Sequence, residues 1–324
     1  MTSIELIKKP IQKEFAIFQE KFREAFESNN EFLSAVHSHI LNKTGKQIRP
    51  LLTLLSAKSV GEINDNTIRC AVSLEMLHTA SLIHDDVVDE SMERRGQASV
   101  NSRWNNKISV LVGDYLLSQS LSIATLTENI LVFKKITQLG KELSEGELLQ
   151  MQNVKNINRD EKKYINVIKK KTATLFDTCT YSGAVSTHCT SEEAEILRKF
   201  GELYGICFQI KDDIFDYIST EEEIGKPVGN DIKEGKITLP LLYALNTNEK
   251  ERNKYIEILS KKDFTKENIE KLIHFSIDNG GIEYAEKRIL DFKAEGDKIL
   301  EKINNIDIRE SLSMMLEHTI NRKK

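Results

Sequence analysis

The sequence predicts an all-α protein. Apolar residues recur at spacings of three and four along most of the chain, which is the period of a helix. Strand-like alternation bounded by turn residues is hard to find, and the chain holds only four prolines. Its 324 residues could form two average domains, but no linker, low-complexity segment or short repeat divides them. We therefore expect a single all-α domain over residues 1–324.

An amphipathic helix is expected first, over residues 4–26. Its apolar residues recur every three or four positions and form one face. These residues are Ile7, Ile11, Phe15, Phe18 and Phe22. Such a face packs either against a helical bundle or against a partner subunit.

A second, short helix is followed by the junction GKQIRP. Gly45 ends one helix and Pro50 starts the next, over residues 51–60, with Lys46 and Arg49 between them. The junction either presents helix amides and cations to an anion or is an ordinary loop with solvated charges.

Further helices are expected over residues 66–90, 108–123, 130–154 and 161–181. In the second of these, Gly113 would allow a close neighbour, and Asp114 is expected to be a buried hydrogen-bond acceptor. The sequence TSEE at 190–193 is a capping box that starts another long helix. The helices after residue 250 are charged and amphipathic, with a break at 279–281.

Two acidic motifs of the same spacing end long apolar helices. The first holds Asp85, Asp86 and Asp89, and the second holds Asp212, Asp213 and Asp216. One such motif is most often solvated surface, but two copies favour a shared role. Carboxylates this close repel one another unless a cation lies between them, and oxygen ligands without thiols suit Mg²⁺. We expect the two motifs to face one another across a cavity.

Basic residues accompany both motifs. Arg94 and Arg95 follow the first motif and either neutralise it or hold phosphate oxygens in bidentate fashion. The lysine triplet at 169–171 is a solvated face with one member that could point inward. The glycine-rich stretch EEEIGKPVGNDIKEGKITLP follows the second motif, carries Lys226 and Lys236, and could order over a bound anion.

Composition excludes several classes of protein. The formal net charge of −4 does not suggest a general nucleic-acid binder. Cys70, Cys179, Cys189 and Cys207 form no CxxC pair and are expected to be buried, reduced thiols. The N-terminus is not a signal peptide, and no run approaches the ~20 apolar residues of a membrane span. We expect a cytoplasmic protein with no transmembrane segment.

The motifs together resemble a known family. GKQIRP, HDDVVDE with RRG, GDYLL, KKTA, FQIKDDIFD and GKPVGNDIKEGKITLP are similar, in order, to signatures of the all-trans polyprenyl diphosphate synthases. The match runs from about Gly45 to Pro240 and is closest to long-chain members such as octaprenyl diphosphate synthase. The resemblance implies an antiparallel helical bundle around a deep central cavity (the isoprenoid synthase type), usually as a homodimer.

The resemblance also implies the reaction. The allylic C1–O bond would ionise and release diphosphate, the double bond of isopentenyl diphosphate would attack the carbocation, and loss of a proton would give a longer diphosphate for a quinone side chain. Three Mg²⁺ would bind the leaving diphosphate, with Asp85 and Asp89 on one side and Asp212 opposite. Asp86, Asp213 and Asp216 would be outer ligands or would orient the others.

Residues for the two substrates follow from the same resemblance. Arg94, Lys171, Lys226 and, more weakly, Lys236 would contact the allylic diphosphate. Lys46, Arg49, His78 and Arg95 would bind isopentenyl diphosphate in a pocket without metal. His78 alone would be interpreted as a core histidine, but it shares a helix face with Asp85. Thr172 and Gln209 would steady the transient cation.

Product length is expected to depend on the helix below Asp85. Ala80 and Ser81, five and four residues before it, are small, so the tail could pass them, which points to a product longer than C15. Leu77 belongs to the same face. Candidates for the floor of the cavity are Leu77, Leu117, Leu121 and Phe133.

Three alternatives remain. A class I terpene cyclase would lack GKQIRP and would usually carry an NSE-like second motif. A non-catalytic subunit of a heteromeric synthase would typically lack an aspartate cluster or a basic contact, and none is missing here. A medium-chain product, from geranylgeranyl to hexaprenyl, is the main alternative within the enzyme interpretation.

Overall fold

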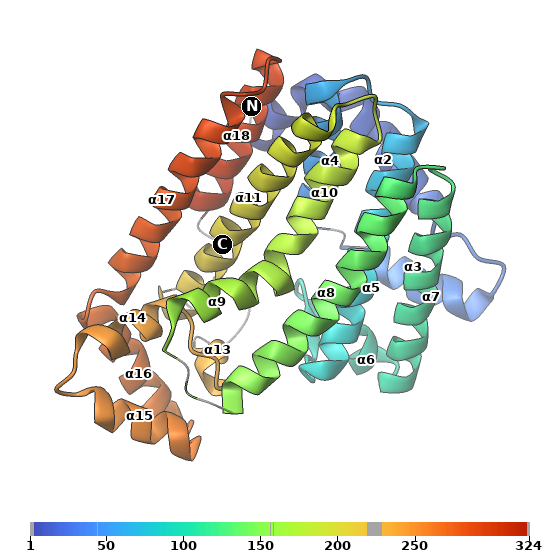
Figure 1. Cartoon of the computed structure of the whole chain (residues 1–324). Helices are drawn as coiled ribbons and strands as arrows, with labels where there is room; N and C mark the ends of the chain where they lie inside the picture. The colour runs from blue at the N-terminus through green and yellow to red at the C-terminus, as the bar shows by residue number, and fades with distance from the viewer. Residues whose placement is uncertain (1–2, 44, 156, 158, 219–228, 323–324) are drawn as a thin grey trace. The chain divides into compact units, whose positions relative to one another are not determined.

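The computed structural model of the chain describes residues 3–43, 45–155, 157, 159–218 and 229–322. Helices dominate these residues, which confirms the all-α prediction (Figure 1). In the described ranges the strands are β1 (Glu93–Arg94) and β2 (Gln97–Ala98), which pair antiparallel.

The helices up to the lysine triplet are α1 (Ser3–Lys8), the 3₁₀ turn η1 (Lys9–Ile11), α2 (Gln12–Glu24), α3 (Glu31–Leu41), α4 (Ile48–Val60), α5 (Asp65–Val88), α6 (Val100–Arg103), α7 (Asn106–Thr125), α8 (Ile130–Lys155) and α9 (Glu161–Ile168). The later ones are the π-helical turn η2 (Lys169–Ala173), α10 (Thr174–Val185), α11 (Ser191–Ile218), α13 (Asn230–Lys233), α14 (Leu239–Thr247), α15 (Arg252–Lys261), α16 (Lys266–Asp278), α17 (Gly281–Leu300) and α18 (Ile306–Asn321).

The chain divides into two compact units. Unit 1 comprises the described residues within Met1–Leu139, Phe176–Gly201 and Glu301–Met314. Unit 2 comprises those within Gly140–Leu175, Glu202–Leu300 and Met315–Lys324. The first acidic motif therefore belongs to unit 1 and the second to unit 2. The single domain stays a prediction.

In unit 1, α5 is the central helix. It packs against α7 along much of its length and also contacts α2, α4 and α6. At one crossing the Ser73 hydroxyl donates to the Ser120 carbonyl at 2.8 Å, and at another His84 lies against Gly113. A Cβ at Gly113 would lie 2.2 Å from His84 Nε2, so the predicted close approach is confirmed.

The N-terminal apolar face is buried inside unit 1. Phe18 is fully buried and Phe22 is 3% exposed, while α2 packs against α4 and α5. This decides between the two alternatives in favour of the bundle, so the face is not available to a partner subunit. The predicted continuous helix over 4–26 is interrupted at η1, where Pro10 has no N–H to donate.

In unit 2, an apolar core gathers α14, α15 and α16. Leu241 and Leu245 of α14 pack with Leu272 and Phe275 of α16, and Ile232 of α13 joins the same core. α14 also packs against α17. This core fixes the short segment from α13 to the start of α14, which carries part of the candidate site.

Several other predictions are corrected. The loop MERRGQAS contains the β1–β2 hairpin, and the predicted helix over 161–181 is α9, η2 and α10. Asp114 is exposed rather than buried, because its side chain projects from an outer face of α7. All four cysteines are free, but Cys189 is only half-buried.

One described helix, α7, is long and apolar enough to cross a membrane by length and composition alone. A third of its apolar window is buried in the protein, and core helices of soluble proteins meet the same criterion.

Candidate active site

The first acidic motif lies at the C-terminal end of α5. Asp85 and Asp86 are in its last turn, and Asp89 is its C-cap residue, with its N–H bonded to the Asp85 carbonyl at 2.8 Å. Asp85 is half-buried, Asp89 is exposed and Asp86 is 3% exposed. Carboxylates at this end are repelled by the negative pole of the helix dipole. A bound cation would relieve that repulsion.

Arg94 connects the hairpin to this motif. Its Nε donates to Asp86 Oδ1 at 2.8 Å, and its Nη2 makes a second, shorter contact with the same oxygen. Arg95 instead donates from Nη1 to the Lys43 carbonyl at 3.0 Å. Of the two roles left open by the sequence, neutralisation of an aspartate is the one observed for Arg94. Phosphate binding stays a prediction.

Charged residues gather around the buried His78 on α5. Burial, and then the nearby Arg49 and Arg95, lower the pKa of His78 well below its usual value, so the imidazole is neutral at pH 7. Burial raises the pKa of Glu75, one turn away, against the opposing effect of the same two arginines. The structure therefore brings Arg49, His78 and Arg95 into one neighbourhood, while Lys46 is exposed. Their role in binding a substrate stays a prediction.

A cavity of about 60 Å³ lies beside this group within unit 1. Its lining includes Lys43, Glu75, Asp86, Arg94 and Arg95. It therefore connects the last turn of α5 with the hairpin and has both cations and carboxylates on its walls.

Gln47 was not anticipated as part of the site. It precedes α4 with a φ of 51°, a left-handed conformation that a residue with a side chain rarely adopts. Gln19 Nε2 donates to its Oε1 at 3.0 Å and holds it in place. Such strained backbone clusters at functional loops. Nothing in the letters GKQIRP marks this conformation.

The residues expected to set product length lie on well-packed helices. Leu77 and Ala80 are 3% and 1% exposed, and Ser81 is half-buried, with its hydroxyl donating to the His78 carbonyl at 2.9 Å. The remaining floor candidates, Leu117, Leu121 and Phe133, are half-buried. The 60 Å³ cavity of unit 1 and the 130 Å³ cavity of unit 2 are lined by other residues. Their role as a tunnel wall stays a prediction.

The second acidic motif occupies the last turns of α11. Arg322, after α18, contacts Asp212 Oδ1 from Nη2 at 2.5 Å, and its guanidinium lies over the Phe208 ring at 4.1 Å. Asp213 is 3% exposed and accepts from the Tyr164 hydroxyl at 2.5 Å. Sequence reasoning missed Arg322 and Tyr164, because each lies far from the motif along the chain.

The pKa values of the second motif reflect burial and crowding of carboxylates. Burial, followed by the charge of Asp231, raises the pKa of Asp213 well above its usual value. The same two causes raise the pKa of Asp216 to about 6. Neighbouring acids thus repel one another here, as expected where a cation is needed.

The lysine triplet forms the π-helical turn η2, which spreads its three side chains over three partners. Lys169 pairs with Glu202 at 2.6 Å, Lys170 with Glu145 at 3.0 Å and Lys171 with Glu147 at 2.6 Å. Wide turns of this kind are rare and often occur at functional sites. The prediction that one member points inward is met by Lys171, which lines a cavity of unit 2.

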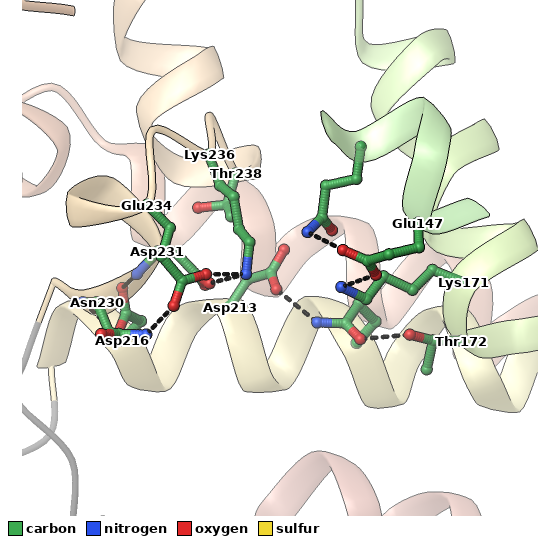
Figure 2. A network of polar contacts seen from close by, with 12 residues as sticks. Glu147, Lys171, Thr172, Asp213, Asp216, Asn230, Asp231, Glu234, Lys236 and Thr238 are labelled. Carbon is green, nitrogen blue, oxygen red and sulfur yellow. Dashed lines mark hydrogen bonds and ion pairs between the residues drawn. The ribbon is translucent and has the colours of Figure 1, made fainter. Parts of the chain in front are cut away.

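That cavity has a volume of about 130 Å³. Among the residues lining it are Lys171, Thr172, Gln209, Asp213, Asp231 and Lys236. Figure 2 shows Lys171 with Thr172 on one side and Lys236 with Asp231 on the other. Lys236 contacts Asp231 Oδ1 at 3.4 Å and, more closely, Glu234. Lys226 lies outside the described residues.

A chain of hydrogen bonds joins three of the residues that line this cavity. Thr172 Oγ1 donates to Gln209 Oε1 at 2.6 Å, and Gln209 Nε2 donates to Asp213 Oδ1 at 2.8 Å. The carboxylate of Asp213 thereby fixes the orientation of the Gln209 amide. The hydroxyl proton of Thr172 is committed to that amide, which leaves the lone pairs of its oxygen available.

The carboxylates suit magnesium. Among the described residues, no three His, Cys, Asp or Glu side chains converge into a ready-made cage. Mg²⁺ usually binds one or two carboxylates together with waters and substrate phosphates, so a cage is not required. Asp85 and Asp89, one turn apart, and Asp212, whose side chain is 41% exposed, are donors of that kind. Because the motifs belong to different units, their facing one another stays a prediction.

Comparisons with known proteins agree on one family. A family model described as polyprenyl synthetase matches residues 30–275. An all-trans-nonaprenyl-diphosphate synthase (geranyl-diphosphate specific) from Rhodobacter capsulatus is 34% identical over 304 residues, which cover 94% of this chain and 93% of that protein.

Solved structures give the same result. A polyprenyl synthase from Caulobacter crescentus CB15, complexed with calcium and isoprenyl diphosphate, has a TM-score of 0.93 at 28% identity, covering 99% of this chain and 98% of that one. A geranylgeranyl pyrophosphate synthase from Bacteroides thetaiotaomicron has a TM-score of 0.86 at 42% identity, covering 99% and 100%.

Proposed function

The chain belongs to the polyprenyl synthetase family, and on that premise we propose that it condenses isopentenyl diphosphate with an allylic diphosphate to make a long-chain all-trans polyprenyl diphosphate. The proposed use of the product is a quinone side chain. The observation that carries the proposal is the cavity of unit 2, where two lysines and a hydrogen-bonded Thr172–Gln209–Asp213 chain share one space.

The lysines of this cavity supply positive charge for a diphosphate. Lys171 and Lys236 are each held by carboxylates, Glu147 for the first and Asp231 with Glu234 for the second. These ion pairs keep the ammonium groups in place, and phosphate oxygens would replace or share the carboxylate partners. A diphosphate bound at these positions would let the hydrocarbon chain of the allylic substrate extend toward the apolar part of the cavity lining.

Magnesium held by Asp85, Asp89 and Asp212 would neutralise the charge that develops on the leaving diphosphate. Thr172 and Gln209 then act on the organic cation. Because the Thr172 proton is donated to the amide, its oxygen presents lone pairs rather than a hydrogen, and so stabilises positive charge. A neutral hydroxyl and a neutral amide are weak nucleophiles, so the cation survives to be attacked by the second substrate.

The second diphosphate is proposed to bind near His78 in unit 1. Arg49 and Arg95 provide charge there, and the buried, neutral imidazole can donate one hydrogen bond without adding charge. We propose that this pocket binds its diphosphate without a metal, because that diphosphate must not ionise. Lys46 would contribute from the exposed junction before α4.

One assay tests the proposal directly. The purified chain is incubated with farnesyl diphosphate, labelled isopentenyl diphosphate and Mg²⁺, and the product is extracted, dephosphorylated and sized. We expect Mg²⁺-dependent incorporation into products longer than C15. Absence of incorporation by the chain alone, with activity restored by a second protein, would instead identify a subunit of a heteromeric synthase.

A medium-chain product is the second candidate. The observation that favours it is the 42% identity to a geranylgeranyl pyrophosphate synthase. The same assay separates the candidates, because a C20 to C30 ladder that stops with isopentenyl diphosphate in excess would support medium-chain activity over long-chain activity.

We further propose that the protein is a homodimer through the outer face of α7. Val110, Leu111 and Tyr115 are 42%, 65% and 37% exposed within six residues of this helix, and grouped exposed apolar side chains are typical of protein interfaces. Light scattering should report a dimer for the native chain and a monomer for Leu111→Asp. The control is Leu290→Asp on α17, a leucine 58% exposed, which should remain dimeric.

The cytoplasm is the proposed location, because both diphosphate substrates are charged, water-soluble molecules. Fractionation of cells should recover the protein in the soluble fraction. Recovery with membranes after a high-salt wash would contradict this location.

A further inference from the structure

Asp216 has a different environment from the other acids of the second motif. Its Oδ1 accepts the N–H of Asn230 at 3.0 Å, and its Oδ2 accepts the N–H of Asp231 at 3.0 Å. Its main-chain carbonyl accepts the N–H of Gly229 at 2.9 Å. Figure 2 shows Asp216 beside Asn230 at the start of α13. Three successive amides are therefore held by one residue of α11.

These contacts supply the cap that α13 lacks locally. The first N–H groups of a helix have no partner within it, and a side-chain oxygen normally accepts one of them. The residue before α13 is Gly229, which has no side chain to do so. The Asp216 carboxylate takes this role from fourteen residues earlier in the sequence, with one oxygen for each amide.

The capped segment carries a predicted substrate contact. The N–H of Lys236 donates to the Asp231 carbonyl at 2.8 Å, and its ammonium group contacts the Asp231 carboxylate at 3.4 Å. Both residues line the cavity of unit 2. The position of Lys236 in that cavity thus depends on α13, and the start of α13 depends on Asp216.

From this geometry we propose that Asp216 is a positioning residue that fixes residues 229–236, and through them Lys236, and that it is not a magnesium ligand. The inference rests on the proposed function for the meaning of Lys236, while the capping contacts are independent of it. It separates the role of Asp216 from that of Asp212, the first acid of the motif, whose carboxylate contacts the guanidinium of Arg322.

Gly229 provides an independent way to disturb the same segment. Its φ is +78°, and a Cβ there would lie 2.5 Å from Ile269 Cγ2 and 3.0 Å from Ile273 Cδ1 on α16. Gly229→Ala should therefore displace the start of α13 without removing any carboxylate. If Asp216 is a metal ligand, Asp216→Ala should weaken Mg²⁺ binding and Gly229→Ala should not. If Asp216 is a positioning residue, the two variants should have similar amide exchange and similar Mg²⁺ binding.

The experiment compares Asp216→Ala, Asp216→Asn, Gly229→Ala and Asp212→Ala with the native chain. Amide hydrogen exchange over residues 229–236 is measured without ligand. Mg²⁺ binding is measured by calorimetry in the presence of a non-ionisable allylic diphosphate analogue, together with the affinity for that analogue at saturating Mg²⁺.

For Asp216→Ala and Gly229→Ala we expect amide exchange in 229–236 to accelerate roughly fivefold or more. The analogue should bind more weakly, with the Mg²⁺ half-saturation within about twofold of native. Asp216→Asn should show an intermediate exchange rate, since its amide oxygen can accept only one of the two N–H groups. Asp212→Ala should show native exchange and a Mg²⁺ half-saturation raised roughly tenfold or more.

Native exchange in Asp216→Ala, or a Mg²⁺ half-saturation raised as far as in Asp212→Ala, would overturn the inference. If Asp216→Ala does not fold, Asp216→Asn and Gly229→Ala decide by the same two measurements. Failure of the proposed function would look different, because the native chain itself would then bind neither the analogue nor Mg²⁺ in its presence, while the exchange comparison would still test the cap.

Discussion

The two acidic motifs have the same spacing but different surroundings. In unit 1, Asp86 is held by the charged guanidinium of Arg94 from the hairpin that follows. In unit 2, Asp213 is held by two neutral groups, the hydroxyl of Tyr164 and the amide of Gln209. In both motifs the middle aspartate is the buried one and acts as an internal anchor.

The difference shows what spacing can and cannot predict. Three aspartates in five residues indicate where a polyanionic helix end will be, because helix geometry places the first and third on one face. Spacing does not indicate which carboxylate oxygens remain for a metal, because that depends on Arg94, Tyr164 and Arg322. We expect Asp85, Asp89 and Asp212, not the middle acids, to carry the metal chemistry.

The largest effect should come from the first acid of each motif. Asp85→Ala and Asp212→Ala should each lower turnover roughly a hundredfold to a thousandfold or more, since each would remove charge stabilisation of the leaving group. Steady-state kinetics at saturating Mg²⁺ measures the loss. Circular dichroism should show native helix content for both variants.

Asp291→Ala is the matched control, because Asp291 is an aspartate on α17 outside both motifs, with its side chain 47% exposed. It should retain turnover within about twofold of native. If Asp85→Ala were as active as Asp291→Ala, the two motifs would not share a function.

The next prediction compares the helices below the motifs. Ala80 lies five residues before Asp85, while Phe208 lies four residues before Asp212 and is covered by Arg322. Ala80→Phe should shorten the product by at least one isoprene unit, because one helical turn of ~5.4 Å is about one isoprene long. Phe208→Ala should leave the product distribution unchanged, even if total turnover falls. An unchanged distribution in Ala80→Phe would show that the tail does not pass this face of α5.

A smaller effect should distinguish the two buried anchors. Asp86→Asn removes the negative charge that faces Arg94. Because a guanidinium cannot accept a hydrogen bond from the new amide, the variant should lower the free energy of unfolding by about 1–3 kcal/mol. Asp213→Asn should cost less than about 1 kcal/mol, because the Tyr164 hydroxyl can accept a hydrogen bond as well as donate one. Urea unfolding measures both. Equal losses would mean that charged and neutral anchoring do not differ here.

The smallest effect concerns pH and belongs to unit 1. His78 has its pKa lowered in the folded protein, so the unfolded chain binds more protons as pH falls through the usual value near 6.5. The stability that His78 contributes is therefore present above that pH and is lost as pH falls toward the folded pKa. His78→Gln should reduce the acid-side slope of unfolding free energy by at most about 1.4 kcal/mol per pH unit.

His37→Gln is the comparison variant, since burial also lowers the pKa of His37 while its bond to the Phe26 carbonyl opposes the shift. His37→Gln should reduce the acid-side slope of unfolding free energy against pH by less than His78→Gln does. An unchanged slope in His78→Gln would indicate that His78 has the same pKa in the folded and unfolded chain, which would contradict the lowered pKa.

Much of the fold could be predicted from the sequence. Long helices have strong periodicity and local signals, and the capping box at 190–193 forms as predicted, with the Thr190 hydroxyl accepting the Glu193 N–H at 3.2 Å. The β1–β2 hairpin could not be predicted, because two residues per strand are too few to show alternation. The break at η1 was signalled only by Pro10.

The site was less predictable than the fold. The acidic motifs and the inward Lys171 carry local signals, namely repeated spacing and a change from charged to apolar residues. The Asp212–Arg322 pair joins residues 110 apart in sequence, so no local pattern reveals it. Gln47 has a left-handed backbone and a side chain bonded to Gln19, 28 residues earlier, which again is a distant contact.

The π-helical turn at Lys169–Ala173 makes the register of this region sensitive to single insertions and deletions. A π turn accommodates about one residue more than an α turn, and each residue rotates a helix by about 100°. Deleting one lysine would let α9 and α10 join as a regular helix. The side chains on one side of the deletion would then point in a different direction around the helix axis. In relatives or engineered variants, a one-residue gap at this point would therefore indicate a different catalytic surface, even where every signature letter is retained.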